Sequence, residues 1–523
     1  MRTPEPETPT GSTICGWTRL VACLLALSSA LLAQDAPRPN VVIIMADDMG
    51  WSDLGCYGGE IRTPNIDRLA AEGLRFTHFY NNAKCTTTRA SLVTGAYPVF
   101  GSGPHLKPDH VTIAEVMKAA GYATALSGKW HLGSKAPHRP IDRGFDDAYG
   151  LWDGCCNFFD PAQPDPKFKG NRVRHFSDNG QRVTEFAEDF YTTDAFTDHA
   201  IACVKRFAGE KRPFFLHVTY TAPHYPLHAF PQDIAKYDGR YDEGWQAVRR
   251  ARHKRIIELG LMNPQWRVPE TDPAIRRSWK GTEHEAWDAL RMETYAAMID
   301  RMDRNIGRLM SALDDAGVAR DTLVMFLSDN GGCAETPGGD DPKQIPGPKE
   351  FYAHCGPAWA FASNTPFRRY KQWAHEGGIA TPLVARWPRA IKADTITHDV
   401  GHVMDFLPTV AELAGVAVPP EKGGKPTRGI DGKSLVPVLR GGRREGHDRL
   451  FWSWGRNRAV REGKWKLVFD RKFRKWELYD LERDRTETED LADAHGERVT
   501  RMSAAWNDWA ATVGLKKVQR PKK

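Results

Sequence analysis

The sequence lacks an apolar run of the length that a membrane span requires. Its most apolar stretch, residues 20–33, falls short of the roughly 20 residues of a transmembrane helix and is interrupted by Ser28 and Ser29. No internal repeat is present. The hydrophobic fraction of 41% and the charged fraction of 27% are ordinary for globular proteins, so composition excludes a disordered chain and a membrane-protein class.

Cysteine is sparse, with nine in 523 residues. Two of them, Cys15 and Cys23, fall within the first 33 residues. Those residues are typical of a secretory leader, because Arg19 precedes an apolar stretch that ends among small side chains. We expect cleavage of residues 1–33 and a secreted or periplasmic protein without stable membrane insertion; an uncleaved anchor is the alternative.

Seven cysteines remain after cleavage, and an odd number in an oxidising compartment raises the question of what chemistry the leftover thiol performs. They are Cys56, Cys85, Cys155, Cys156, Cys203, Cys333 and Cys355. Their pairing stays open.

The formal net charge is only +7. This mild excess suits an anionic substrate, and we expect no nucleic-acid partner.

Four apolar runs are typical of strands buried on both faces of a mainly parallel sheet. They are residues 40–45, 214–220, 322–327 and 381–385. Between them, residues 295–313 place their apolar side chains on one helical stripe. The alternation predicts an α/β fold with a large, mixed, mainly parallel sheet flanked by helices. Ligands of such folds bind beyond the carboxyl ends of the strands.

The pattern changes after residue 439. Residues 458–468 and 475–481 alternate polar and apolar side chains like antiparallel strands, and residues 498–513 are helical. We therefore predict a catalytic domain over residues 37–440 and a small α+β C-terminal subdomain over residues 441–523 that contains an antiparallel sheet.

Polar pairs follow two of the predicted strands. Asp47 and Asp48 come after the first, and Asp329 and Asn330 come after the strand that begins near Thr322. We expect both pairs to meet at one sheet edge, where carboxylate and amide oxygens favour Ca²⁺ over Zn²⁺. Taken singly, each pair is also compatible with a helix cap or a tight turn.

Residues 85–95 (Cys-Thr-Thr-Thr-Arg-Ala-Ser-Leu-Val-Thr-Gly) resemble the sulfatase signature, in which a Cys or Ser is followed by Arg and then by a helix ending in Thr-Gly. Further sulfatase-like segments occur in order along the chain. They are residues 47–50, 63–67, 128–133, 222–224, 328–332, Lys371 with residues 376–378, and residues 431–435. This resemblance implies the alkaline phosphatase-like fold and a sulfuric ester hydrolase of the arylsulfatase type.

The resemblance also implies that Cys85 is oxidised to formylglycine by a formylglycine-generating enzyme during maturation. The hydrated aldehyde then attacks the sulfur of a sulfate ester, and its second hydroxyl allows the covalent sulfate to be released. The implied ligands of one Ca²⁺ ion are the Cys85-derived group and the four polar side chains at the strand ends: Asp47, Asp48, Asp329 and Asn330.

The remaining catalytic roles are also implied by the resemblance. Arg89, four residues after Cys85, holds the hydrate and the metal-bound carboxylates, while Lys129 and Lys371 bind sulfate oxygens. His131 deprotonates the diol during sulfate release, and His224 protonates the departing alcohol. One position departs from the pattern: Thr87 stands where the family usually has Pro or Ala. We still expect conversion of Cys85.

Two alternatives remain. A phosphate mono- or diester hydrolase shares the fold and the metal, whereas a catalytically silent protein that binds sulfated glycans would keep Cys85 unmodified. The substrate is a sulfated small molecule or glycan. Aromatic and basic segments that could contact it are residues 152–159, His175, His228, residues 249–266 and Trp359, although packing explains most aromatics.

Overall fold

The computed structural model describes residues 1, 3–4, 38–98, 105–275, 278–279 and 284–515. Nearly all of the expected leader, residues 1–33, lies outside this part, so its cleavage stays a prediction. Across the described residues, no helix combines the length and the apolar character that crossing a membrane would need.

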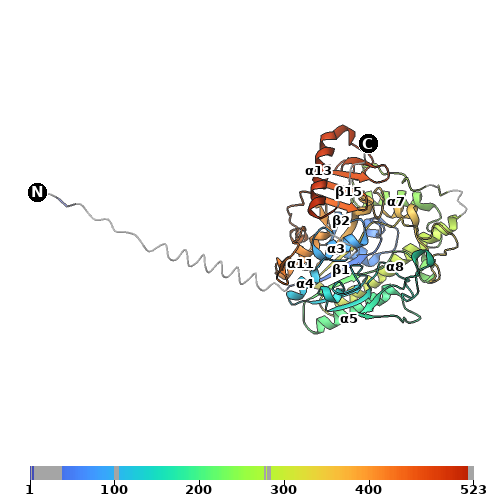
Figure 1. The fold of residues 1–523 in the computed structure, drawn as a ribbon, viewed down its shortest axis with the longest axis horizontal. Helices are drawn as coiled ribbons and strands as arrows, with labels where there is room; N and C mark the ends of the chain where they lie inside the picture. Colours follow the sequence, from blue (N-terminus) through green and yellow to red (C-terminus); the bar gives the residue numbers. More distant parts are fainter. Residues whose placement is uncertain (2, 5–37, 99–104, 276–277, 280–283, 516–523) are drawn as a thin grey trace. The chain divides into compact units, whose positions relative to one another are not determined.

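A sheet of eleven strands forms the centre of the described chain (Figure 1). From one edge the strands are β10 (Thr395–Thr397), β2 (Leu74–Tyr80), β9 (Ala380–Arg386), β8 (Thr322–Ser328), β1 (Asn40–Ala46), β7 (Phe214–Thr219), β3 (Ala123–Gly128), β4 (Asp147–Leu151), β5 (Phe176–Asp178) and β6 (Gln181–Arg182), and β11 (Gly401–His402) pairs with β2. The five strands from β8 to β4 run parallel, whereas β9 is antiparallel to both of its neighbours. The predicted mixed, mainly parallel sheet is confirmed.

Helices cover both faces of the sheet because alternate side chains of its central strands point to opposite sides. In β1, Val42 and Ile44 belong to one apolar core, and Val41, Ile43 and Met45 belong to the other. The first core is shared with α2 (Pro64–Ala71), α5 (Thr192–Gly209) and α8 (Glu285–Asp315). The second is shared with α3 (Cys85–Thr94), α4 (Ile113–Ala119) and α11 (Phe406–Ala414), which Figure 1 shows grouped together.

Smaller elements connect these layers. They are α6 (Pro231–Ile234), α7 (Gly244–Glu258), α9 (Gly356–Ser363), α10 (Glu376–Ile379), α12 (Val436–Leu439) and the hairpin of β12 (Glu421–Lys422) with β13 (Lys425–Pro426). Helix α8 begins ten residues before the predicted helix. Its first turns bury charged side chains such as Arg291, which bonds to Asp288 at 2.8 Å, so no apolar stripe marks them.

A second sheet follows near the carboxyl end. Strands β14 (Leu450–Trp454), β15 (Asn457–Glu462), β16 (Trp465–Asp470) and β17 (Lys475–Asp480) are antiparallel, and α13 (Gly496–Thr512) packs on β15 and β16. The predicted antiparallel sheet is confirmed, although residues 458–468 form a hairpin of two strands and β14 was not predicted. Residue 440 as the domain boundary stays a prediction.

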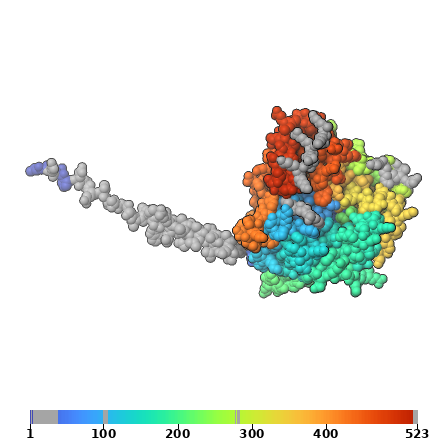
Figure 2. Space-filling model, viewed as in Figure 1, coloured from blue at the N-terminus to red at the C-terminus, as the bar shows by residue number. Residues whose placement is uncertain are grey.

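The second sheet contacts the first part of the chain directly. Trp452 donates its indole N–H to the Asn81 carbonyl at 2.7 Å, and the backbone N–H of Phe451 donates to the Tyr97 hydroxyl at 3.2 Å. In Figure 2 red atoms of the carboxyl-terminal part of the chain lie next to blue atoms of the amino-terminal part that the structure describes. Because Asn81 leads into α3, the second sheet supports the segment that carries Cys85.

Candidate active site

The carboxyl ends of β1 and β8 bring four polar side chains together. The strands are parallel neighbours with Ala46 opposite Ser328, so Asp47 and Asp329 leave the sheet at the same edge. The amide group of Asn330 donates to Asp48 Oδ1 at 2.7 Å, and the backbone N–H of Asp48 donates to Asp329 Oδ1 at 3.2 Å. The structure thus brings together the four residues that the sequence grouped.

Cys85 is the first residue of α3 and is 1% exposed. Its sulfur lies 3.5 Å from Nδ1 of His131. One helical turn later, Arg89 donates from Nε and Nη2 to Asp329 Oδ2 at 3.0 and 2.8 Å, and from Nη1 to the Lys129 carbonyl at 2.7 Å. Arg89 therefore links the start of α3 to the carboxylate edge and to the end of β3.

Thr87 also has a structural role in this helix. Its hydroxyl donates to the backbone carbonyls of Asn82 at 2.9 Å and of Lys84 at 2.8 Å. The residue that departs from the sulfatase pattern therefore satisfies carbonyls at the start of α3.

Two buried lysines each contact one of the paired carboxylates. Nζ of Lys129, just after β3, lies 2.5 Å from Asp47 Oδ2, and Nζ of Lys371 lies 2.7 Å from the Asp48 carboxylate. Burial alone would lower the pKa of each lysine, but Asp47 raises that of Lys129 and Asp48 raises that of Lys371. Both ammonium groups are therefore charged at neutral pH.

The two predicted catalytic histidines meet at this edge as well. Nε2 of His224 lies 3.3 Å from Asp48 Oδ2, and its Nδ1 lies 2.6 Å from the Tyr225 carbonyl, so the proton sits on Nδ1. Burial, with nearby Lys371 and Lys129, holds the pKa of His224 well below its ordinary value. Burial and Lys129 do the same for His131, so both imidazoles are neutral at pH 7.

The carboxylate edge fits a hard divalent cation. Oδ1 of Asp47 and Oδ1 of Asn330 are buried and have no hydrogen-bond partner, although native proteins rarely leave such oxygens unpaired. Burial, and after it the neighbouring Asp329, raise the pKa of Asp47 to about 8. Oxygen donors of this type and number are those that Ca²⁺ prefers.

Glu335 is a site residue that sequence reasoning missed. One of its oxygens lies 3.1 Å from Nζ of Lys371, and both lie within 3.5 Å of Nζ of Lys84. Burial would raise the pKa of Glu335, but Lys371 and Lys84 lower it far more. Its position five residues after Asn330 is the only sequence signal that could have pointed to it.

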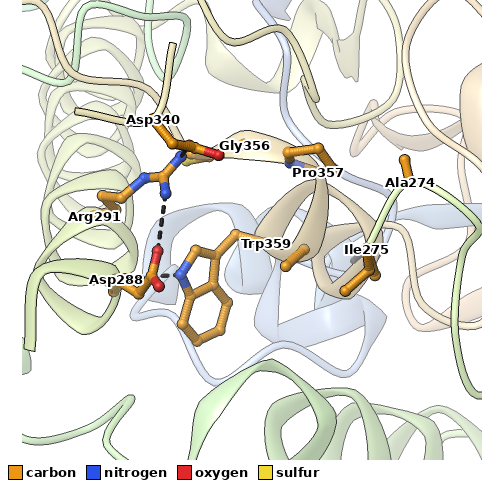
Figure 3. Close-up of a pocket in the computed structure, with 10 residues that line it drawn as sticks. Ala274, Ile275, Asp288, Arg291, Asp340, Gly356, Pro357 and Trp359 are labelled. Atoms are coloured by element: carbon orange, nitrogen blue, oxygen red, sulfur yellow. Dashed lines mark hydrogen bonds and ion pairs between the residues drawn. The ribbon is translucent and has the colours of Figure 1, made fainter. Parts of the chain in front are cut away.

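Several of the proposed substrate-contacting residues are structural instead. Trp359 is 1% exposed and lines the pocket drawn in Figure 3, where its indole N–H donates to the Asp288 carbonyl at 2.7 Å. His228 is equally buried and bonds to the Phe351 carbonyl at 2.8 Å. Arg249 is buried against backbone carbonyls, among them that of Phe361 at 2.8 Å. These three residues are corrected to core positions.

The seven cysteines that follow the expected leader are all buried and unpaired in the described chain. Cys85 thus carries a free sulfur, but so do the other six. What distinguishes Cys85 is its surroundings, because Arg89, Lys129 and His131 all lie around the start of α3.

Comparisons with known proteins cover most of the chain. Residues 39–416 match the family model described as Sulfatase, and residues 368–505 match the one described as N-sulphoglucosamine sulphohydrolase, C-terminal. An uncharacterised sulfatase of Schizosaccharomyces pombe is 33% identical, with 92% of this chain and 95% of the relative covered. An arylsulfatase of Klebsiella aerogenes is 32% identical, with 80% and 94% covered.

Solved structures agree with these matches. The crystal structure of Ps i-CgsB superposes with a TM-score of 0.68 at 27% identity, covering 92% of this chain and 94% of that one. The phosphonate monoester hydrolase of Agrobacterium radiobacter shares the fold, with a TM-score of 0.56 at 21% identity, covering 91% and 96%.

Proposed function

The chain belongs to the sulfatase family and is therefore a sulfuric ester hydrolase, and on this premise we propose that its nucleophile is a formylglycine made from Cys85 beside a bound Ca²⁺ ion. The observation that carries the proposal is the buried pair of unpartnered oxygens on Asp47 and Asn330; Oδ1 of Asp47 lies 4.0 Å from Nη2 of Arg89, on the helix that Cys85 begins. Such oxygens are stabilised by a cation that they can ligate.

Four side chains would hold the ion: Asp47, Asp48, Asp329 and Asn330. When bound, the ion would polarise sulfate oxygens and favour the ionised hydroxyl of the hydrated aldehyde. Arg89 keeps Asp329 in position through two hydrogen bonds to one oxygen, which leaves the other oxygen, Oδ1, at the edge. The chain itself therefore orients the ligand set.

Lys129 and Lys371 bind the oxygens of the sulfate group. Both ammonium groups are already fixed by carboxylates, so they need little reorganisation as negative charge grows in the transition state. Because the two ammonium groups contact different members of the Asp47–Asp48 pair, we expect a tetrahedral anion to be held between them. A bound sulfate ester supplies the negative charge that the two lysines face.

The histidines move the protons. Neutral His131, with Nδ1 near the Cys85 sulfur, accepts a proton from the hydroxyl that replaces this sulfur. His224 must deliver a proton from Nε2 to the departing alcohol. Burial and the two lysines keep it neutral in the free site, and the anionic ester opposes the lysines, which favours protonation when substrate is bound.

A phosphate ester hydrolase is the second candidate, because the phosphonate monoester hydrolase of Agrobacterium radiobacter has the same fold. A sulfated sugar is our preferred substrate class, since the family cleaves sulfate esters and the related Ps i-CgsB forms a complex with k-i-k-neocarrahexaose. Turnover of 4-nitrophenyl sulfate well above that of 4-nitrophenyl phosphate supports sulfate specificity, and the reverse order contradicts it.

Maturation is proposed to accompany export behind the leader of residues 1–33. The test is mass spectrometry of the tryptic peptide that spans residues 85–89, from protein produced together with a formylglycine-generating enzyme. We expect an aldehyde at Cys85, and we expect Cys85→Ala protein to show neither aldehyde nor turnover. An unmodified thiol in an active enzyme would contradict the proposal and favour a different nucleophile.

A further inference from the structure

Glu335 is the carboxylate at this site that lies outside the proposed cation ligands. It sits in the loop after β8, and its side chain is 31% exposed, whereas those of Asp47 and Asp48 are at most 1% exposed. Of these carboxylates, Glu335 is therefore the one that a group arriving from solvent can reach.

Glu335 is held rigidly at this position. Nζ of Lys371 lies 3.1 Å from its Oε2, and the side-chain amide of Gln372 donates to its Oε1 at 2.8 Å. The Tyr225 hydroxyl donates to Oε2 at 3.4 Å, and the thiol of Cys333 donates to the same oxygen at 3.4 Å. A carboxylate fixed by so many partners keeps one orientation while a substrate binds.

We refer to Lys84 and Glu335 together as the mouth of the site, because both side chains are partly exposed. Nζ of Lys84 lies 3.4 and 3.5 Å from the two oxygens of Glu335, and its other side faces the Trp454 ring at 5.9 Å from the centroid. Lys84 directly precedes Cys85 and is 15% exposed on its side chain. In addition to Lys129 and Lys371, the site thus carries the negative charge of Glu335 and the positive charge of Lys84, which balance each other.

We propose that Glu335 selects the chemical group next to the sulfated carbon of the substrate, an inference that rests on the function proposed above. Because Glu335 touches Lys371, which binds the sulfate, groups on the adjacent carbon come close to its oxygens. A hydroxyl or amine there donates a hydrogen bond to Glu335, whereas a carboxylate or second sulfate is repelled. The substrate class is a sulfate ester with a neighbouring hydrogen-bond donor.

Three aryl sulfates test this without knowledge of the natural substrate. They are 4-nitrophenyl sulfate and its derivatives with a hydroxyl or a carboxylate at the position ortho to the sulfate. We measure kcat/KM for each with the mature wild-type enzyme and with Glu335→Gln, Lys84→Met and Glu421→Gln. The last variant neutralises an exposed glutamate of β12 as a matched control.

The two mouth variants should change selectivity in opposite directions. Relative to unsubstituted 4-nitrophenyl sulfate, Glu335→Gln should raise kcat/KM for the carboxylate derivative about tenfold, and Lys84→Met should lower it by a similar factor. Glu421→Gln should leave the ratio unchanged. General damage to the site would lower kcat/KM for all three substrates together, so it cannot shift the ratio of the carboxylate derivative to 4-nitrophenyl sulfate in opposite directions in the two variants.

Two results have different meanings. If the wild-type enzyme turns over the aryl sulfates and neither mouth variant shifts the ratio, the role of Glu335 is wrong while the proposed function stands. If mature wild-type enzyme hydrolyses neither these aryl sulfates nor a sulfated sugar, the proposed function itself is contradicted.

Discussion

His131 depends on its neighbours for its position. Its backbone has φ of 57°, a conformation that few residues other than glycine adopt, and its ring lies beside Gly154. A Cβ atom at Gly154 would lie 2.7 Å from Cε1 and 2.8 Å from Nε2 of the imidazole. Only a glycine at residue 154 therefore leaves room for the ring that faces Cys85.

Gly154→Ala should therefore reduce turnover without unfolding the protein. The new methyl group displaces the imidazole by a few tenths of an ångström or more, and such a misplacement costs up to roughly a hundredfold in kcat. Steady-state kinetics with 4-nitrophenyl sulfate measures the loss. Gly209→Ala is the control, because a Cβ there meets no atom within 4 Å. Equal activity of the two variants would show that His131 does not need its present position.

At the scale of elements, the sequence predicted the buried strands best. Uninterrupted apolar runs marked β1, β7 and β8, and polar residues after β1 and β8 marked the site. Glu335 and Lys84 were not predicted because loop geometry, rather than periodicity, brings Glu335 to Lys371 and Lys84 to Glu335. Helix α8 was predicted too short because ion pairs, not apolar contacts, bury its first turns.

An element with a predictable energetic role is β16, which carries Lys466. Its buried Nζ lies 2.7 Å from Glu376 at the start of α10 and 2.8 Å from Glu487. Burial would raise the pKa of Glu376, but Lys466 and Arg485 lower it to about 2 from its ordinary 4.5. The pair therefore stabilises the fold above pH 4.5, and this contribution is lost as pH falls towards 2.

Lys466→Met should lower the free energy of unfolding by about 3 kcal/mol at pH 7, because it leaves buried Glu487 without its lysine and leaves Glu376 with Arg485 alone. The difference from wild type should narrow at pH 3, where Glu376 of the variant, with one cation fewer, takes up a proton. Urea unfolding at the two pH values measures both effects. Lys475→Met, at a largely exposed lysine of β17, should change stability by less than about 1 kcal/mol. If the free energies of unfolding of wild type and Lys466→Met differ by the same amount at both pH values, the role of Glu376 is contradicted.

At the scale of the whole described chain, the fold brings segments that are distant in the sequence together at the site. Two apolar cores hold the sheet from both faces, so the ends of β1, β8 and β3 keep fixed positions. The second sheet supports the segment before α3 through Trp452. Residues separated by more than 280 positions can therefore form a hydrogen bond, as Asp48 and Asn330 do.

The central claim is that a cation held by two neighbouring strand ends acts on a nucleophile derived from Cys85. The measurement is kcat/KM for 4-nitrophenyl sulfate and the calcium content of Asp329→Ala, compared with Glu421→Ala, with circular dichroism to verify folding. Asp329→Ala should lose bound calcium and at least about a thousandfold in kcat/KM while it stays folded, because the ion contributes several kcal/mol to the transition state. A folded Asp329→Ala enzyme with wild-type turnover would contradict the account.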